Sequence, residues 1–326
     1  MILRRLALLA AFAASALHVS AQDYKGAIVI DAATGQSIFE DNPDVVSPPA
    51  SVTKLMTFLV VHDALAAGRI ALTTPVTADA TDQSMGGTQV NLATGETFTV
   101  EELLYALMVE SANDAASALT HAAAANRAEF VVLMNARAKS LGMKNTVFRS
   151  PHGLPPSSKN LADGDLTSPR DLALLSRELV SKTDVLRYSS VRTRPFAEGV
   201  RAETLHMLNH NKLMGKVAGV DGLKTGYTKG AGFCLAATAQ RGNQRIIVVT
   251  MGSATSKGRD LRIAKLIEDS FPLVPASSAF KGYTPSPASP IAAENASPIV
   301  AAPATATPPA VTDAPMVKFS IPAKKK

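Results

Sequence analysis

Strand-like segments stand near both ends of the folded part of this chain and enclose a largely helical middle. Residues 27–39 contain two short apolar runs around a Thr34-Gly35 turn, which predicts a β-hairpin. Three more strand-like runs come late, at residues 220–225, 232–239 and 245–251. Because one antiparallel sheet can hold both chain ends, we expect an α/β fold of the α+β type, with a helical lobe packed against that sheet.

The middle of the chain carries apolar residues at helical spacing. One run follows Ser51 to about Ala67, where Gly68 ends it, and another begins near Asn113 in an alanine-rich stretch. Ser168-Pro169 is a strong helix start, since serine caps helices and proline suits the first turn. These patterns and a last run near the end of the domain predict helices over residues 51–67, 113–125, 168–181 and 257–269.

The first 21 residues have the pattern of a secretory signal peptide. Arg4 and Arg5 form a short basic start, residues 6–17 are apolar, and Val19-Ser20-Ala21 supplies small residues for cleavage. The apolar run is too short to span a bilayer comfortably. The sequence therefore predicts an exported protein of the periplasm or cell envelope that begins near Gln22 after cleavage.

Composition changes abruptly at Phe271-Pro272. Eleven of the 20 prolines lie from this point to the end of the chain, mixed with alanine, serine and threonine. Such a segment has too little apolar bulk to offset its ordering entropy. We therefore expect residues 272–326 to be a disordered tether and residues 22–271 to be one folded domain.

The net charge of +6 is concentrated at the two ends of the chain. Arg4 and Arg5 contribute two charges and the segment after residue 271 contributes three, which leaves +1 for the folded domain. A nearly neutral domain does not present a basic face, so no nucleic-acid partner is expected. The terminal Lys324-Lys325-Lys326 allows a weak contact with an anionic membrane or wall polymer.

Three short motifs occur in order along the domain. They are Ser51-Val52-Thr53-Lys54 (SxxK), Ser111-Ala112-Asn113 (SxN) and Lys224-Thr225-Gly226 (KTG). Each motif is weak alone, because Ser278-Ala279-Phe280-Lys281 and Ser158-Lys159-Asn160 match the first two patterns in a proline-rich tail and in a loop. The order and the structural context therefore separate the candidates from chance matches.

The SxxK motif suits a nucleophilic serine. Ser51 stands at a helix start, and Lys54, three residues on, lies on the same face. A serine hydroxyl needs a base to take its proton, and an amine is a base only when it is neutral. Lowering a lysine pKa from about 10.4 to near 7 costs on the order of 4–5 kcal/mol, which burial and a second cation such as Lys224 can supply.

The KTG motif suits the edge of a strand that binds a carboxylate. Lys224 offers a positive charge, and Thr225 offers a hydroxyl donor. Gly226 lets a substrate approach the backbone closely, because it has no side chain.

Together the three motifs resemble the active-site serine penicillin-recognising enzymes. The longer matches at residues 51–57, 111–115, 152–154 and 221–228 look like the low-molecular-mass D-alanyl-D-alanine carboxypeptidases in particular, over about residues 23–271. The resemblance implies a β-lactamase/transpeptidase-like fold without a metal or other cofactor. It also implies peptidoglycan stem peptides as substrates and β-lactam antibiotics as covalent inhibitors.

The resemblance assigns catalytic roles to the residues of the motifs. Ser51 attacks the carbonyl between two D-alanines, and Lys54 takes its proton. Ser111 passes that proton to the leaving amine with help from Lys224. Water, activated by Lys54, then releases the shortened peptide.

The resemblance also assigns substrate-binding roles. Asn113 binds the substrate amide, and Lys224 and Thr225 hold the terminal carboxylate beside Gly226. The backbone N–H groups of Ser51 and Tyr227 form the oxyanion hole.

Two features depart from the family pattern. Some members place an arginine upstream of KTG, where this chain has Leu208-Asn209-His210-Asn211-Lys212, so His210 is the nearest candidate for an extra carboxylate contact. Some members also carry a further β-rich domain and an amphipathic anchor, where this chain has only the tail.

His206 and His210 lie four residues apart, but the nearby asparagines and Gly215 argue against a helix, so no metal site is predicted.

Three other interpretations share parts of this pattern. A class A β-lactamase would carry SDN instead of Ser111-Ala112-Asn113 and a glutamate that activates the deacylating water, for which we find no convincing candidate before Lys224. A DD-endopeptidase keeps the same catalytic groups, so the motifs barely discriminate it. A non-enzymatic wall-binding protein is disfavoured because every catalytic group is present.

Overall fold

The computed structural model describes residues 23–284. The predicted signal peptide and the terminal lysines lie outside this described part. Among the residues described, no helix combines the length and the apolar character needed to cross a bilayer.

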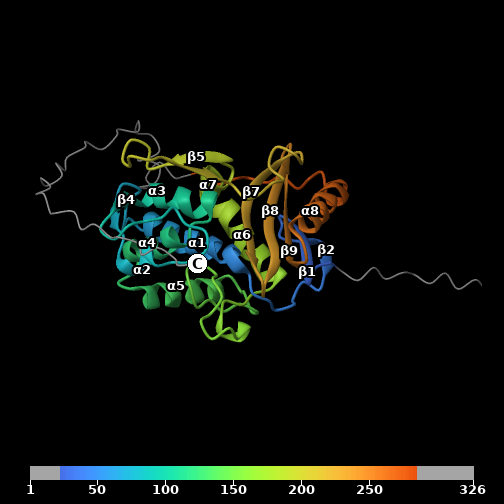
Figure 1. Ribbon diagram of the computed structural model, residues 1–326. Coiled ribbons are helices and arrows are strands. Elements are labelled where there is room, and N and C mark those ends of the chain that lie inside the picture. The colour runs from blue at the N-terminus through green and yellow to red at the C-terminus, as the bar shows by residue number, and fades with distance from the viewer. Residues whose placement is uncertain (1–22, 285–326) are drawn as a thin grey trace, which may run out of the picture.

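The core of the fold is a five-stranded antiparallel sheet, as predicted (Figure 1). The N-terminal hairpin contributes β1 and β2, and β1 pairs with the last strand, β9, so both ends of the domain meet in one sheet. Strand β7, which carries the KTG motif, is an edge strand. In spatial order the strands are β2 (Ser37–Asp41), β1 (Gly26–Asp31), β9 (Gln244–Ser253), β8 (Gly232–Arg241) and β7 (Val220–Thr228).

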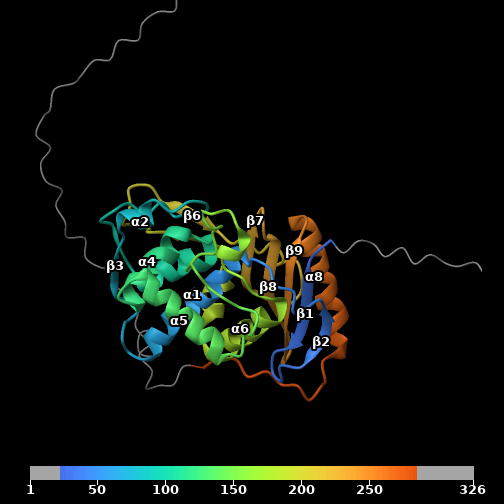
Figure 2. The same cartoon turned by 90° about the horizontal axis from the view of Figure 1, so that it is seen from below.

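Both faces of the sheet are covered, which explains why its three inner strands, β1, β9 and β8, are largely apolar and buried. Ile28 and Ile30 point into the core of the helical lobe, whereas Ala27 and Val29 point to the opposite face. The last helix, α8 (Ser256–Ser270), covers that opposite face. Figure 2 shows α8 on one side of the sheet and the helical lobe on the other.

The helical lobe is built around α1 (Lys54–Ala66), whose side chains are almost all buried. Apolar residues on every side of this helix allow neighbours to pack around it. The other elements of the lobe are β3 (Pro75–Thr77), α2 (Ala80–Gln83), β4 (Thr97–Thr99), α3 (Val100–Tyr105), η2 (Ala106–Glu110), α4 (Asn113–Ala123), α5 (Arg127–Ser140), η3 (Leu161–Asp163), α6 (Pro169–Lys182), α7 (Val185–Ser189), β5 (Thr193–Phe196) and β6 (Leu205–Leu208).

The start of α6 agrees with its sequence signal. The Ser168 hydroxyl accepts a hydrogen bond from the backbone N–H of Asp171 at 3.2 Å, and Pro169 is the first helical residue. Asp171 in turn accepts hydrogen bonds from Asn145 and Thr146. Ser168 thus caps the start of α6, and Asp171 ties the helix to the preceding loop.

The chain stays packed on the domain beyond the predicted boundary at Phe271-Pro272. After η4 (Phe271–Leu273), residues 274–284 form a C-terminal strap that runs from α8 toward the helical lobe, along the lower edge of the view in Figure 2. The Gln244 side chain donates to two strap carbonyl oxygens, each at 3.0 Å. The prediction of disorder from residue 272 is therefore wrong for residues 272–284.

Individual side chains explain why the strap is ordered. The Ser278 hydroxyl is buried and donates to the Asp31 carboxylate. The guanidinium carbon of Arg245 lies 5.2 Å from the centroid of the Phe280 ring. The rings of Tyr283 and His62 pack in a T-shaped arrangement. The proline content of the whole tail predicted disorder because it takes no account of these individual contacts.

Candidate active site

Ser51 lies in a single 3-10 turn, η1 (Ala50–Thr53), that leads into α1. It therefore stands in the turn before the helix, which begins at Lys54. Ala50 has a left-handed φ of 51°. The turn packs against Gly153, where a Cβ atom would lie 2.0 Å from the Ala50 carbonyl oxygen, so only glycine fits at that position.

The amino group of Lys54 is buried beside Ser51. Its Nζ donates to Asn113 Oδ1 at 2.6 Å and to the His152 carbonyl oxygen at 2.9 Å, and it lies 3.1 Å from Ser51 Oγ. Burial, followed by the positive charge of Lys224, holds the pKa of Lys54 well below its usual range. A neutral amine at this position can accept the Ser51 hydroxyl proton, which a serine nucleophile requires.

The SxN motif reaches this group from the start of α4. Asn113 Nδ2 donates to the Gly86 carbonyl oxygen at 2.7 Å, and the Asn113 backbone N–H donates to the Thr88 carbonyl oxygen at 2.8 Å. Ser111 is nearly buried and has a left-handed φ of 67° directly after η2, a turn of π-helix. Such backbone irregularities are common at functional sites.

Lys224 places a second buried lysine near Lys54, as the sequence predicted. Burial and the neighbouring Arg259 lower the pKa of Lys224 to about 7, while the negative charge of Glu110 acts in the opposite direction. Lys224 Nζ donates to the Thr225 carbonyl oxygen at 3.2 Å. The positive charge of Lys224 disfavours the ammonium form of Lys54, as expected for a base that must stay neutral.

Strand β7 packs directly on the serine turn. A Cβ atom on Gly226 would lie 2.6 Å from the Pro49 carbonyl oxygen and 3.0 Å from the Ser51 backbone nitrogen. The next residue, Tyr227, is 56% exposed, and its ring stacks on Phe233 with a centroid distance of 4.1 Å. The free edge of β7 thus runs past the nucleophile, where an extended peptide can pair with it.

His210 lies on the side of the site where Lys224 and Glu110 stand. Its Nε2 is 3.1 Å from the Glu110 carbonyl oxygen. Burial and then the charge of Lys224 lower the pKa of His210. His206 lies on β6 and His210 in the following loop, so the two do not share a helix face.

The two chance matches lie elsewhere. Ser158 is exposed and donates to Asp163 in its own loop. Ser278 belongs to the strap and is bound to Asp31. Their positions in a loop and in the proline-rich tail had already distinguished both matches from the candidate SxxK and SxN motifs.

Sequence reasoning missed two buried charged residues beside the site. Asp165 accepts hydrogen bonds from Thr53 Oγ1 at 2.9 Å and Ser150 Oγ at 2.9 Å, and so ties the serine turn to the loop that carries His152. Arg259 comes from the first turn of α8, and its charge lowers the pKa of Lys224. Neither residue stands in a short motif, so only the folded arrangement identifies them.

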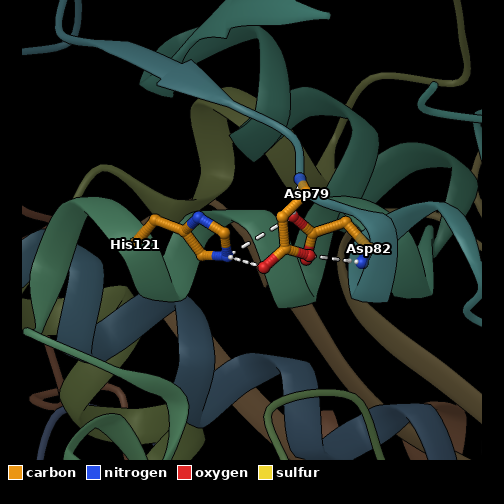
Figure 3. Close-up of side chains that lie close together, drawn as sticks. All are labelled: Asp79, Asp82 and His121. Carbon is orange, nitrogen blue, oxygen red and sulfur yellow. Dashed lines mark hydrogen bonds and ion pairs between the residues drawn. The ribbon is translucent and has the colours of Figure 1, made fainter. Parts of the chain in front are cut away.

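A second cluster of titratable side chains joins α2 to α4 (Figure 3). His121 Nε2 lies 3.3 Å from Asp82 Oδ2 and 3.7 Å from Asp79 Oδ2. Within residues 23–284 these three are the one acidic and histidine group close enough to hold a metal ion. Arg127 Nη2, however, lies 2.8 Å from both carboxylates and neutralises them, which favours a structural ion-pair network.

In this fold, the buried lysine of the SxxK motif lies next to Ser51 and beside an edge strand that bears KTG, which is the arrangement expected of the penicillin-recognising class of proteins. The sequence matches the family model for D-alanyl-D-alanine carboxypeptidase over residues 10–255. This chain belongs to that family.

Curated relatives and solved structures agree. The chain is 35% identical over 254 residues to D-alanyl-D-alanine carboxypeptidase DacF of Bacillus subtilis, covering 77% of this chain and 63% of that protein. It is 36% identical over 258 residues to DacA of Escherichia coli, covering 77% and 60%. It therefore spans less than two thirds of the length of these relatives.

Among solved structures, penicillin-binding protein D2 of Listeria monocytogenes in its ampicillin-bound form superimposes with a TM-score of 0.68. The two sequences are 31% identical, and the match covers 76% of this chain and 97% of that one. The expected penicillin-binding fold is confirmed.

Proposed function

We propose that this chain is a serine-type D-alanyl-D-alanine carboxypeptidase that removes the terminal D-alanine from peptidoglycan stem pentapeptides. The observation that carries the proposal is the buried Lys54 Nζ, 3.1 Å from Ser51 Oγ and close to a second buried lysine, Lys224. This arrangement supplies a nucleophile with a neutral base, and it places a cation for the substrate carboxylate nearby.

The reaction divides into acylation and deacylation. Ser51 Oγ attacks the carbonyl carbon of the penultimate D-alanine, and Lys54 accepts the hydroxyl proton. Lys54 returns that proton through the Ser111 hydroxyl to the leaving nitrogen, the C–N bond breaks, free D-alanine departs, and Lys54 is again a neutral amine. Water then gives a proton to Lys54 and attacks the ester carbonyl, which releases the shortened peptide and returns a proton to Ser51 Oγ.

Substrate binding follows from the edge strand. Lys224 and Thr225 would hold the terminal carboxylate through charge-assisted hydrogen bonds, with His210 as an additional contact on the same side. Asn113 Nδ2 donates one N–H to the Gly86 carbonyl oxygen, and its second N–H would bind the carbonyl oxygen of the substrate amide.

The oxyanion hole would be formed by the backbone N–H groups of Ser51 and Tyr227. The close approach of Gly226 to the Ser51 nitrogen supports this geometry, because it brings β7 next to the serine turn. Each such donor contributes about 3–4 kcal/mol to transition-state stabilisation.

The same serine should react with β-lactams, since ampicillin is bound in the similar penicillin-binding protein D2. The signal-like N-terminus and the proposed substrate class support a location in the periplasm or cell envelope. The terminal lysines could add a weak contact with membrane or wall.

The experiment is release of free D-alanine from a stem pentapeptide, compared with cleavage of a cross-linked dimeric muropeptide. The proposal predicts that pentapeptide trimming dominates. Faster cleavage of the dimer would identify a DD-endopeptidase instead, and rapid penicillin turnover would favour a β-lactamase.

A further inference from the structure

Glu110 occupies the junction between two parts of the site. It ends η2 immediately before Ser111, and its carboxylate Oε2 accepts a hydrogen bond from the backbone N–H of Leu208 at 3.0 Å. Its carbonyl oxygen lies 3.1 Å from His210 Nε2, and its Oε1 lies 3.9 Å from the same nitrogen. One residue thus links the SxN turn to the segment that leads from β6 toward KTG.

The setting of Glu110 differs from that of most other glutamates in the described chain. Six of them pair with an arginine, whereas the groups that face Glu110 are Lys224 of β7 and His210 of the loop after β6. The arginine-paired residues are Glu40, Glu96, Glu101, Glu102, Glu178 and Glu268.

The charge of Glu110 matters because Lys224 is buried. Burial and Arg259 of α8 both lower the pKa of Lys224, and the carboxylate of Glu110 is the group that raises it. Burial also raises the pKa of Glu110 itself, while the Leu208 N–H and the charge of Lys224 act the other way. A lysine that binds a carboxylate must carry its proton, so Glu110 sustains the form of Lys224 that binding needs.

We propose that Glu110 is a positioning residue for the pocket that binds the substrate carboxylate: its carboxylate places a negative charge on the side of Lys224 and anchors Leu208, and its carbonyl oxygen holds His210 beside the turn that carries Ser111. This inference rests on the proposed carboxypeptidase function. It assigns no covalent step to Glu110.

The test compares Glu110→Gln and Glu110→Ala with the wild-type protein across pH. Glutamine keeps an acceptor for the Leu208 N–H but removes the charge, so the alkaline limb of kcat/KM on a free-acid D-Ala-D-Ala peptide should move down by about 0.5 pH unit or more. On the acidic side of that limb the rate should stay within about threefold of wild type. A peptide with an amidated C-terminus should show no shift, because it lacks the carboxylate.

Glu110→Ala removes both the charge and the acceptor. It should show the same shift and, in addition, a pH-independent fall in kcat, because Ser111 loses its support. Glu178→Gln is the matched control, since it removes a carboxylate paired with Arg137 away from the site, and it should leave the profile unchanged.

Superimposable profiles for Glu110→Gln and wild type would overturn the proposal, as would equal losses at every pH in both variants. If Glu110→Ala does not fold, the glutamine variant alone decides. The pH dependence of Ser51 acylation by benzylpenicillin, which also carries a carboxylate, gives a second readout. That readout remains decisive even if no D-alanine is released and the proposed function fails.

Discussion

Lys54 Nζ lies 2.6 Å from Asn113 Oδ1, so the lysine of the SxxK motif and the asparagine of the SxN motif form one hydrogen-bonded unit. The two residues are 59 positions apart in sequence. Helices α1 and α4 must therefore pack against each other before Lys54 and Asn113 can form this hydrogen bond. The chemistry of the base therefore depends on the side chain at position 113.

Asn113→Asp should disable the base through charge. A carboxylate at this distance favours the ammonium form of Lys54, which raises the pKa of Lys54 from its lowered value. The acidic limb of kcat/KM should move to higher pH, with activity near neutral pH reduced roughly a hundredfold. Asn126→Asp, which exchanges one good cap of α5 for another, is the control. An unchanged acidic limb in Asn113→Asp would contradict the assignment of Lys54 as the base.

Gly226→Ala should block the site without unfolding the domain. The added Cβ would meet the Pro49 carbonyl oxygen at 2.6 Å and the Ser51 nitrogen at 3.0 Å, so β7 must move away from the serine turn. We expect kcat/KM to fall at least about a hundredfold, with the melting temperature lowered by only a few degrees. Gly282→Ala, whose Cβ meets nothing closer than 3.8 Å, should match wild type. Full activity in Gly226→Ala would show that this close approach is irrelevant to catalysis.

Much of this arrangement could be predicted from the sequence, because its signals are local. The alternation of Ala27 to Ile30 and the cap at Ser168 identify elements directly, and motif order identifies Ser51 and Lys224. Burial of Lys54 follows from its place on a helix that is apolar all round.

Other features depend on contacts between distant segments and have no local pattern. Asp165, Glu110 and Arg259 are single charged residues whose role appears only when several elements meet. Composition alone predicts disorder for the strap, because its order depends on contacts of Ser278 and Phe280 with the sheet and of Tyr283 with α1.

Thr225→Ala tests whether the terminal carboxylate is recognised as proposed. A charge-assisted hydrogen bond contributes about 1.5–3 kcal/mol, so kcat/KM on a free-acid D-Ala-D-Ala peptide should fall roughly ten- to a hundredfold. The amidated peptide should lose much less, because it never makes the full contact. Wild type and variant are compared on both peptides. Equal losses on the two substrates would make Thr225 structural and remove the main support for a carboxypeptidase over an endopeptidase.

Truncation should distinguish the strap from the rest of the tail. A chain that ends at Leu273 loses the buried Ser278 and the Phe280–Arg245 contact, and should be destabilised by about 1–3 kcal/mol. This corresponds to roughly 2–4 °C in melting temperature for each kcal/mol. A chain that ends at Thr284 keeps these contacts and should melt like the full-length protein. Identical melting temperatures for both truncations would show that the strap contributes nothing to stability.

The central claim is that Ser51 is the nucleophile, and its most direct test is covalent labelling of the purified protein with benzylpenicillin. Intact-mass analysis followed by peptide mapping should find one adduct per chain on the peptide that contains Ser51, and Ser51→Ala should remain unlabelled. The buried amine of Lys54, 3.1 Å from the hydroxyl, is the reason to expect this reaction at this serine. Absence of an adduct in wild type, or an adduct mapped to Ser111 or any other residue, would contradict the account.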